Sequence, residues 1–207
     1  MNTFPKMVEI LPEGTSGQVV VRHIEVTEQD SAFTRIRAIQ HGRDAYVPAG
    51  RYAHLMVGHT LMMSDTPMEQ RTNSGIVRQA HGHVLIAGLG LGMIPHPIAA
   101  KANVTEITVI EKYADVIRLV GPTLPAKVRV IEADIFTWKP EKGTRYDTLY
   151  WDIWPDITES NLDEMATLNR RFARCKAEDA WMGAWCQDEL KAQRRRNRAQ
   201  PQRRWSW

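Results

Sequence analysis

The chain has 207 residues, of which 43% are hydrophobic and 25% are charged, a composition typical of a soluble globular protein with a sizeable core. No apolar run reaches the roughly 20 residues that a membrane-spanning helix needs, and the N-terminal residues show no apolar signal-peptide core. The two cysteines, Cys175 and Cys186, exclude a disulfide scaffold, and no cysteine or histidine has the spacing of zinc ligands. We therefore expect a cytoplasmic protein with no membrane partner and no metal.

The net charge of +3 conceals an uneven distribution of charge along the chain. Residues 191–207 contain seven bases and no acid, and subtracting these seven from +3 leaves −4 for the remainder. A basic end of this composition predicts a disordered, solvated tail. Nucleic-acid binding by its arginines, with the terminal tryptophans stacking on bases, is the functional alternative.

The N-terminal region, residues 1–80, shows the patterns of a strand, a helix, a hairpin and a second helix. Ala32, Phe33, Ile36 and Ile39 would form the apolar face of the first helix. Gly58 stands at the first turn position of the hairpin, which favours a type II′ turn. The elements are expected at residues 17–26, 27–40, 52–65 and 67–80.

Apolar strand segments and helical segments alternate from residue 81 to residue 190. This alternation predicts an α/β fold with a Rossmann-like, mostly parallel sheet and helices on both faces. The chain ends about twenty residues after the fifth strand segment, so we expect a sheet shortened at its C-terminal side and extended by the N-terminal elements. The strands are expected at residues 84–89, 107–111, 128–134, 146–152 and 180–186, and the helices at 93–102, 113–120 and 158–176.

Three glycines, Gly88, Gly90 and Gly92, directly follow the first strand of this region. A bend without side chains allows the backbone to approach a ligand closely. The next strand ends in Glu111, whose carboxylate could accept hydrogen bonds from both ribose hydroxyls of a nucleoside; the alternative is an acid that favours the start of a helix. A nicotinamide cofactor fits less well, because Met93 occupies the position of the third glycine in G-x-G-x-x-G.

The third and fourth strands also end in acidic residues. Asp134 could accept a hydrogen bond from the exocyclic amine of adenine while Ile135 and Phe136 cover the ring; alternatively, Asp134 is a loop acid and Phe136 belongs to the core. Asp152 and Asp156 follow the fourth strand. Since ligands of open α/β sheets bind beyond the carboxyl ends of the strands, these acids are expected to converge on one rim of the sheet.

With these motifs, residues 50–187 resemble the class I S-adenosylmethionine-dependent methyltransferase superfamily, and within it the spermidine-synthase-like branch. VLIAGLGLGM resembles the glycine motif, VTEITVIEKYADVIRLV the strand with the ribose-binding acid, VRVIEADIF the strand with the adenine-side acid, and YDTLYWDIWPD the strand that ends at the reacting group. The resemblance implies S-adenosylmethionine as the cofactor. It implies cofactor contacts at Gly88, Gly90, Gly92, Glu111, Asp134 and Ile135, and catalytic positions at Asp152 and Asp156.

The expected function is therefore methyl transfer to a small-molecule acceptor. Aminopropyl transfer from decarboxylated S-adenosylmethionine and non-catalytic cofactor binding remain alternatives. Aminopropyltransferases carry an Asp inside the glycine-rich loop, where this chain has Leu89 and Leu91. The segment of that branch that corresponds to residues 64–69 carries an acidic pair followed by Tyr and His, and this chain lacks the Tyr and the His. Trp151 and Trp154 would either pack in the core or face a cation. Association into a homodimer also stays open.

Overall fold

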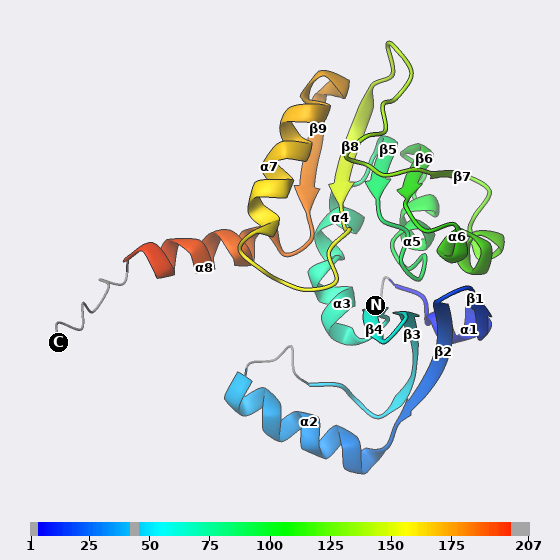
Figure 1. Ribbon diagram of the computed structural model, residues 1–207, viewed down its shortest axis with the longest axis vertical. Helices are drawn as coiled ribbons and strands as arrows, with labels where there is room; N and C mark the ends of the chain where they lie inside the picture. The colour runs from blue at the N-terminus through cyan, green and yellow to red at the C-terminus, as the bar shows by residue number, and fades with distance from the viewer. Residues whose placement is uncertain (1–3, 42–45, 200–207) are drawn as a thin grey trace.

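A computed structural model describes residues 4–41 and 46–199, without the side chains of residues 40 and 41. The described residues form two sheets (Figure 1). The antiparallel N-terminal sheet has the order β1-β2-β3-β4, formed by Gly14–Ser16, Val19–Val26, Gly50–Val57 and Thr60–Ser64. The second sheet has the order β7-β6-β5-β8-β9, formed by Val128–Glu132, Val104–Glu111, Gly82–Ala87, Tyr146–Trp151 and Lys176–Ala184.

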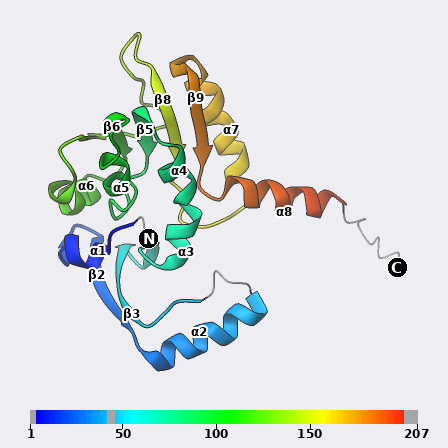
Figure 2. The same ribbon diagram turned by 180° about the vertical axis from the view of Figure 1, so that it is seen from behind.

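All neighbouring strands of the five-stranded sheet run parallel, which confirms the Rossmann-like expectation. The inner strands are rich in buried apolar residues because helices cover both faces of the sheet. Helices α4, α5 and α6 lie on one face and α7 lies on the other, as the two opposite views show (Figures 1 and 2). These helices span Ser74–Gln79, Pro95–Ala99, Ala114–Val120 and Asn161–Phe172.

The N-terminal strands do not extend the parallel sheet, and this expectation is wrong. β1 to β4 pair with one another in a separate antiparallel sheet, and one cluster of buried apolar side chains runs through both sheets. On the surface, Ser16 donates a hydrogen bond of 2.7 Å to Asp115 at the start of α6. Asp65 joins α1 (Met7–Ile10) to the hairpin by accepting the backbone N–H groups of Met7 and Ala53 at 2.9 and 2.7 Å.

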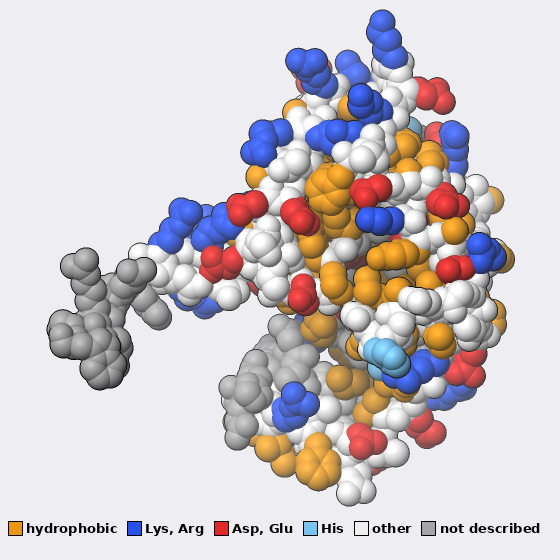
Figure 3. Space-filling model, in the orientation of Figure 1, with side chains coloured by type: hydrophobic (Ala, Val, Ile, Leu, Met, Phe, Trp, Pro, Cys, Tyr) orange, Lys and Arg blue, Asp and Glu red, His pale blue; other side chains and the backbone are white. Residues whose placement is uncertain are grey.

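Helix α2 (Glu28–His41) begins where the sequence predicts, because Thr27 and Asp30 cap it reciprocally. Its predicted apolar face is not buried, however. Phe33, Ile36 and Ile39 are 62%, 58% and 84% exposed. In the described part of the chain, no element covers this side of α2, which forms the lower end of the molecule in Figure 3.

The helix predicted at residues 67–80 is divided into α3 (Pro67–Thr72) and α4. The division lies at Asn73, whose buried side chain accepts a hydrogen bond of 2.9 Å from the Tyr150 hydroxyl and donates one of 3.1 Å to the Glu69 carbonyl. A contact to a strand 77 residues later in the sequence therefore determines where the helix is interrupted.

The basic end of the chain is helical as far as Ala199, so the expected disorder is wrong for residues 191–199. Helix α8 (Gln187–Ala199) is anchored by Leu190, which is fully buried, and by Arg194, which donates a hydrogen bond of 2.8 Å to the Glu159 carbonyl. The remaining residues of the predicted tail, 200–207, lie outside the described residues. Among the described helices, none has the length and apolar character needed to cross a membrane.

Candidate functional site

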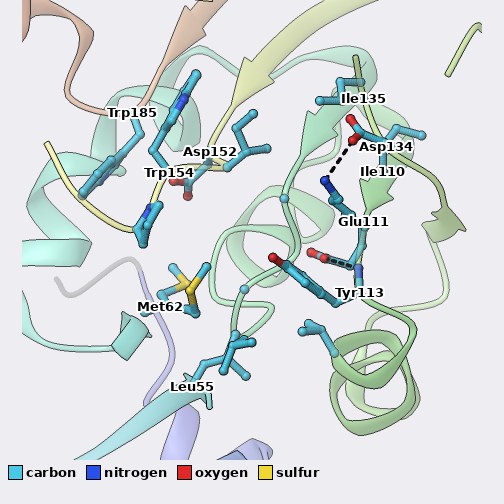
Figure 4. Close-up of a pocket in the computed structure, with 18 of the residues that line it drawn as sticks. Leu55, Met62, Ile110, Glu111, Tyr113, Asp134, Ile135, Asp152, Trp154 and Trp185 are labelled. Carbon is cyan, nitrogen blue, oxygen red and sulfur yellow. Dashed lines mark hydrogen bonds and ion pairs between the residues drawn. The ribbon is translucent and has the colours of Figure 1, made fainter. Parts of the chain in front are cut away.

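A pocket lies beyond the carboxyl ends of β5, β6, β7 and β8. Its volume is about 500 Å³, within the range of small-molecule sites. In Figure 4, Asp152, Trp154 and Trp185 lie on one side of the pocket, Glu111 and Asp134 on the opposite side, and Leu55 and Met62 of the N-terminal sheet complete the wall. Apolar side chains surround the hollow in the middle of the molecule's face (Figure 3).

The three predicted glycines form the bend after β5, all with positive φ: 94° at Gly88, 54° at Gly90 and 76° at Gly92. Gly88 and Gly90 line the pocket, whereas Gly92 does not. A Cβ atom at Gly88 would lie 1.9 Å from the Asp152 carbonyl oxygen, and one at Gly92 would lie 3.0 Å from the Val120 side chain. The glycines are therefore needed for close contacts within the protein as well as for an open pocket wall.

Glu111 at the end of β6 is tied to this bend. Its carboxylate accepts the backbone N–H groups of Leu89 and Tyr113, both at 2.8 Å. Burial raises the pKa of Glu111, and the N–H groups of Tyr113, Leu89 and Lys112 oppose this rise. A carboxylate offers about four lone-pair positions, so acceptor capacity remains for hydroxyl groups of a ligand in the pocket.

Asp134 follows β7 and lies on the same side of the pocket as Glu111 (Figure 4). One oxygen accepts the Phe136 N–H at 2.9 Å and the other pairs with the Lys112 ammonium at 3.0 Å. The Phe136 N–H, with a smaller effect from Lys112, lowers the pKa of Asp134. Ile135 is buried and lines the pocket together with Phe136. The sequence did not indicate Lys112.

Asp152 lies at the opposite side of the pocket, at the end of β8. Desolvation raises its pKa to about 7. Glu69 of α3, which the sequence did not single out, also lines the pocket, and burial followed by repulsion from Asp152 raises its pKa to about 8. The two carboxyl groups are thus close enough to interact, and both change charge near neutral pH. The sequence did contain a signal for Glu69, because residues 64–69 correspond to the segment in which the aminopropyltransferase branch carries acids.

Asp156 does not join Asp152 in the pocket, and the structure contradicts the expectation that the two act together. Asp156 is exposed in the loop after β8 and lies outside the pocket wall. Its backbone carbonyl accepts a hydrogen bond of 2.8 Å from the Asn161 amide at the start of α7. The loop therefore leaves the pocket after Pro155, so that Asp152 and Asp156 have different surroundings.

Three of the seven tryptophans divide into a core residue and two pocket residues. Trp151 is fully buried and donates a hydrogen bond of 2.8 Å to Asn169, so it packs in the core. Trp154 and Trp185 line the pocket, and the Trp154 indole donates a hydrogen bond of 2.6 Å to Glu164. Indole rings held in this way offer flat, electron-rich faces to a cation.

The described lining residues give the pocket an acidic character. Lys112 is the only base among them, and it is already paired with Asp134. A cationic ligand would therefore be favoured over an anionic one. No group of three or more metal-ligating side chains occurs within the described residues. The acids that line the pocket are Glu69, Glu111, Asp134, Asp152 and Glu164.

The sequence matches no family model, and the comparison with curated proteins finds no match. Among solved structures, the chain resembles the DhpI–SAH complex (TM-score 0.42, 18% identity, 56% of this chain and 52% of that chain). It also resembles the N-methyltransferase NodS from Bradyrhizobium japonicum WM9 (0.46, 15%, 58% and 68%). A third is SAM-bound CalS10, an amino pentose methyltransferase from Micromonospora echinaspora (0.38, 19%, 52% and 42%). The chain thus spans about half of the length of the first of these structures. The residues assigned to the site above are those that the geometry of this chain places around the pocket.

Proposed function

We propose that the protein is an S-adenosylmethionine-dependent methyltransferase whose acceptor is a small molecule with an amine nucleophile. The observation that carries the proposal is the bond between Glu111 and Leu89, which fixes the acid at the tip of β6 against the glycine bend. Asp134 from the next strand lies on the same side of the same pocket. The sequence motifs that resemble the methyltransferase superfamily are the ones expected to bring the glycine bend and these two acids together.

The chemistry of the pocket fits the adenosine part of this cofactor. Glu111 retains acceptor capacity for ribose hydroxyls, and Asp134 can accept from an exocyclic amine. Ile135 and Phe136 supply apolar surface beside it for a flat ring. Gly88 and Gly90 leave the wall between the two sides of the pocket free of side chains. The acidic lining suits a ligand with positive charge.

The residues on the Asp152 side would bind, orient and deprotonate the acceptor. When bound, S-adenosylmethionine supplies a methyl group already activated by its sulfonium. The protein must therefore hold a nucleophile in line and exclude water. Asp152, with a pKa of about 7, can accept a proton from an ammonium group near neutral pH. Glu69 is placed to share that proton, while Trp154 and Trp185 confine the acceptor.

Calorimetric titration with S-adenosylmethionine, its decarboxylated form and NAD tests the cofactor assignment. We expect binding of S-adenosylmethionine, and a loss of about 10- to 100-fold in Glu111→Gln, since a hydrogen bond to a charged group contributes about 1.5–3 kcal/mol. Glu132→Gln is the matched control, because Glu132 is exposed and pairs in register with Glu111 on the next strand. Preference for NAD, or equal affinity of both variants, would contradict the assignment.

Release of S-adenosylhomocysteine in the presence of a panel of primary and secondary amines tests catalysis. We expect Asp152→Asn to lower the transfer rate by about 100-fold or more while cofactor affinity is retained, because general-base catalysis is lost. Asp156→Asn is the control, since this acid lies outside the pocket. Binding without turnover of any acceptor would favour a non-catalytic cofactor-binding protein.

Aminopropyl transfer, the activity of the spermidine-synthase-like branch, is the second candidate. One observation favours it: Glu69, from the segment where that branch carries acids, faces the same pocket as Asp152. Tighter binding of the decarboxylated form, together with an amine product that is heavier by one aminopropyl group, would support this function. A gain of one methyl group would exclude it.

A further inference from the structure

A second depression, of about 430 Å³, lies between α7 and α8, away from the pocket described above. Its two sides differ in character. Leu162, Met165 and Ala166 of α7 form an apolar side, and four basic residues of α8 form the other. We call this depression the α7–α8 groove; its basic residues are Lys191, Arg194, Arg195 and Arg198.

The four bases follow one another at helical spacing. Positions 191, 194, 195 and 198 lie on one face of a helix, and with a rise of 1.5 Å per residue they extend over about 10 Å. A row of this length exceeds what a single small anion can contact. The groove therefore presents positive charge along a line.

Two of these bases have partners that hold α8 in place. Arg194 bonds to Asp163 at 3.2 Å and to the Glu159 carbonyl at 2.8 Å, and Lys191 lies 4.0 Å from Asp188. The Glu159 carboxylate also lies 3.9 Å from Arg194, so these acids offset part of the charge of Lys191 and Arg194.

The other two bases, Arg195 and Arg198, are exposed and pair with no carboxylate in residues 4–41 and 46–199. The groove thus holds two uncompensated cations.

We propose that the α7–α8 groove binds the phosphodiester backbone of single-stranded nucleic acid. The row of bases would contact successive phosphates, as positively charged grooves that follow a single-stranded backbone do. The sequence beyond the helix adds Arg203 and Arg204 and no acid. The rest of the protein has a charge of opposite sign, so the attraction is local to this end.

An anionic membrane surface is a less suitable partner for the same charges. A helix that lies on a membrane needs an exposed apolar face beside its bases. On α8 the large apolar side chain, Leu190, is fully buried. In the described residues, the exposed large apolar side chains belong to other segments of the chain.

Fluorescence anisotropy with the full chain and labelled single strands of about 20 nucleotides tests the proposal through the salt dependence of binding. We expect Arg195→Gln/Arg198→Gln to weaken binding about tenfold and to make the slope of log K against log salt less negative by about 1.4, since each phosphate contact contributes about 0.7. The matched control is Arg35→Gln/Arg37→Gln, which removes two exposed arginines from α2. Both variants must retain the circular dichroism spectrum of the parent protein.

Three outcomes would overturn the proposal: no binding by the unmodified protein, the same affinity and slope in the α8 variant, or an equal loss in the α2 control. Binding to phosphatidylserine vesicles but not to single strands would overturn it in favour of a membrane surface. The proposal does not depend on the proposed function, because nucleic-acid binding and cofactor titration are separate measurements. The same α8 variant should titrate S-adenosylmethionine like the parent protein.

Discussion

The two sides of the large pocket use carboxyl groups in opposite ways. On the β6–β7 side, Glu111 accepts two backbone N–H groups and Asp134 accepts one N–H group and pairs with Lys112. On the β8–α3 side, Asp152 accepts no hydrogen bond from the described residues. At Glu69, only the backbone N–H of Ser64 opposes the rise in pKa. One side is rich in donors and the other is poor in them.

This difference separates positioning from proton transfer. Donors that favour the charged form lower the pKa of Asp134, and at Glu111 they oppose the rise in pKa that burial causes. Burial without donors raises the pKa towards neutrality, to about 7 at Asp152 and about 8 at Glu69. Groups with such pKa values can exchange protons under physiological conditions. We therefore assign ligand binding to the first side and chemistry to the second.

Gly88 is where the two sides meet, and Gly88→Ala should have the largest effect on the molecule. The new Cβ would lie 1.9 Å from the Asp152 carbonyl oxygen. We expect a loss of about 2–5 kcal/mol in the free energy of unfolding, from overpacking of about 1–3 kcal/mol added to a positive-φ cost of about 1–2 kcal/mol. Urea denaturation measures this loss.

Gly143→Ala is the matched control for the backbone strain. Its φ of 92° is close to the 94° of Gly88, but no atom lies within 4 Å of the position of its Cβ. We expect it to lose only the positive-φ cost of about 1–2 kcal/mol. Equal losses in the two variants would show that the close approach of β5 to the Asp152 carbonyl does not constrain the bend.

The donor-poor side should make stability depend on pH, and Glu69→Gln should reduce that dependence. The pKa of Glu69 is raised from 4.5 to about 8 in the folded protein, so the folded state binds more protons than the unfolded state between these values. Its contribution is present below pH 4.5 and is lost as the pH rises through about 8. At high pH we expect Glu69→Gln to be more stable than the parent protein by about 2–4 kcal/mol.

Thermal unfolding between the two pKa values and above them measures this effect. Glu25→Gln, at an exposed position on β2, is the control and should follow the parent curve. A parent protein whose stability rises with pH in this interval would contradict the assignment of a protonated Glu69. If the Glu69→Gln variant kept the full pH dependence of stability, a group other than Glu69 would be its cause.

The parts of the fold that the sequence predicted well are those determined locally. β5 and β6 contain short, mostly apolar segments, and Val84, Leu85 and Ile107 are fully buried, so the pattern itself indicates the parallel sheet. The glycine bend and Glu111 followed from position at strand ends. By contrast, β1 has three residues and α1 has four, too few for a periodic pattern to be detected.

The remaining differences arise from contacts between distant parts of the chain. The break at Asn73 depends on Tyr150. The burial of Glu69 depends on the approach of α3 to the pocket, which no local pattern reveals. The sequence assigned Asp156 to the same site as Asp152 because only three residues separate them, but the loop after β8 leaves Asp152 in the pocket and Asp156 in solvent.

Lys112→Met should have the smallest effect of these variants. It tests whether the Lys112 ammonium or the Phe136 N–H determines the charge and position of Asp134 on the β6–β7 side of the pocket. The Lys112 side chain is 63% exposed, and an exposed ion pair contributes about 0–1 kcal/mol to stability. The Phe136 N–H, the larger cause of the lowered pKa of Asp134, remains in the variant. We expect an affinity for S-adenosylmethionine within about threefold of the parent protein, or about 0.7 kcal/mol, measured by calorimetry. A fall of tenfold or more would mean that the ammonium group of Lys112, and not the backbone, prepares this side of the pocket for its ligand.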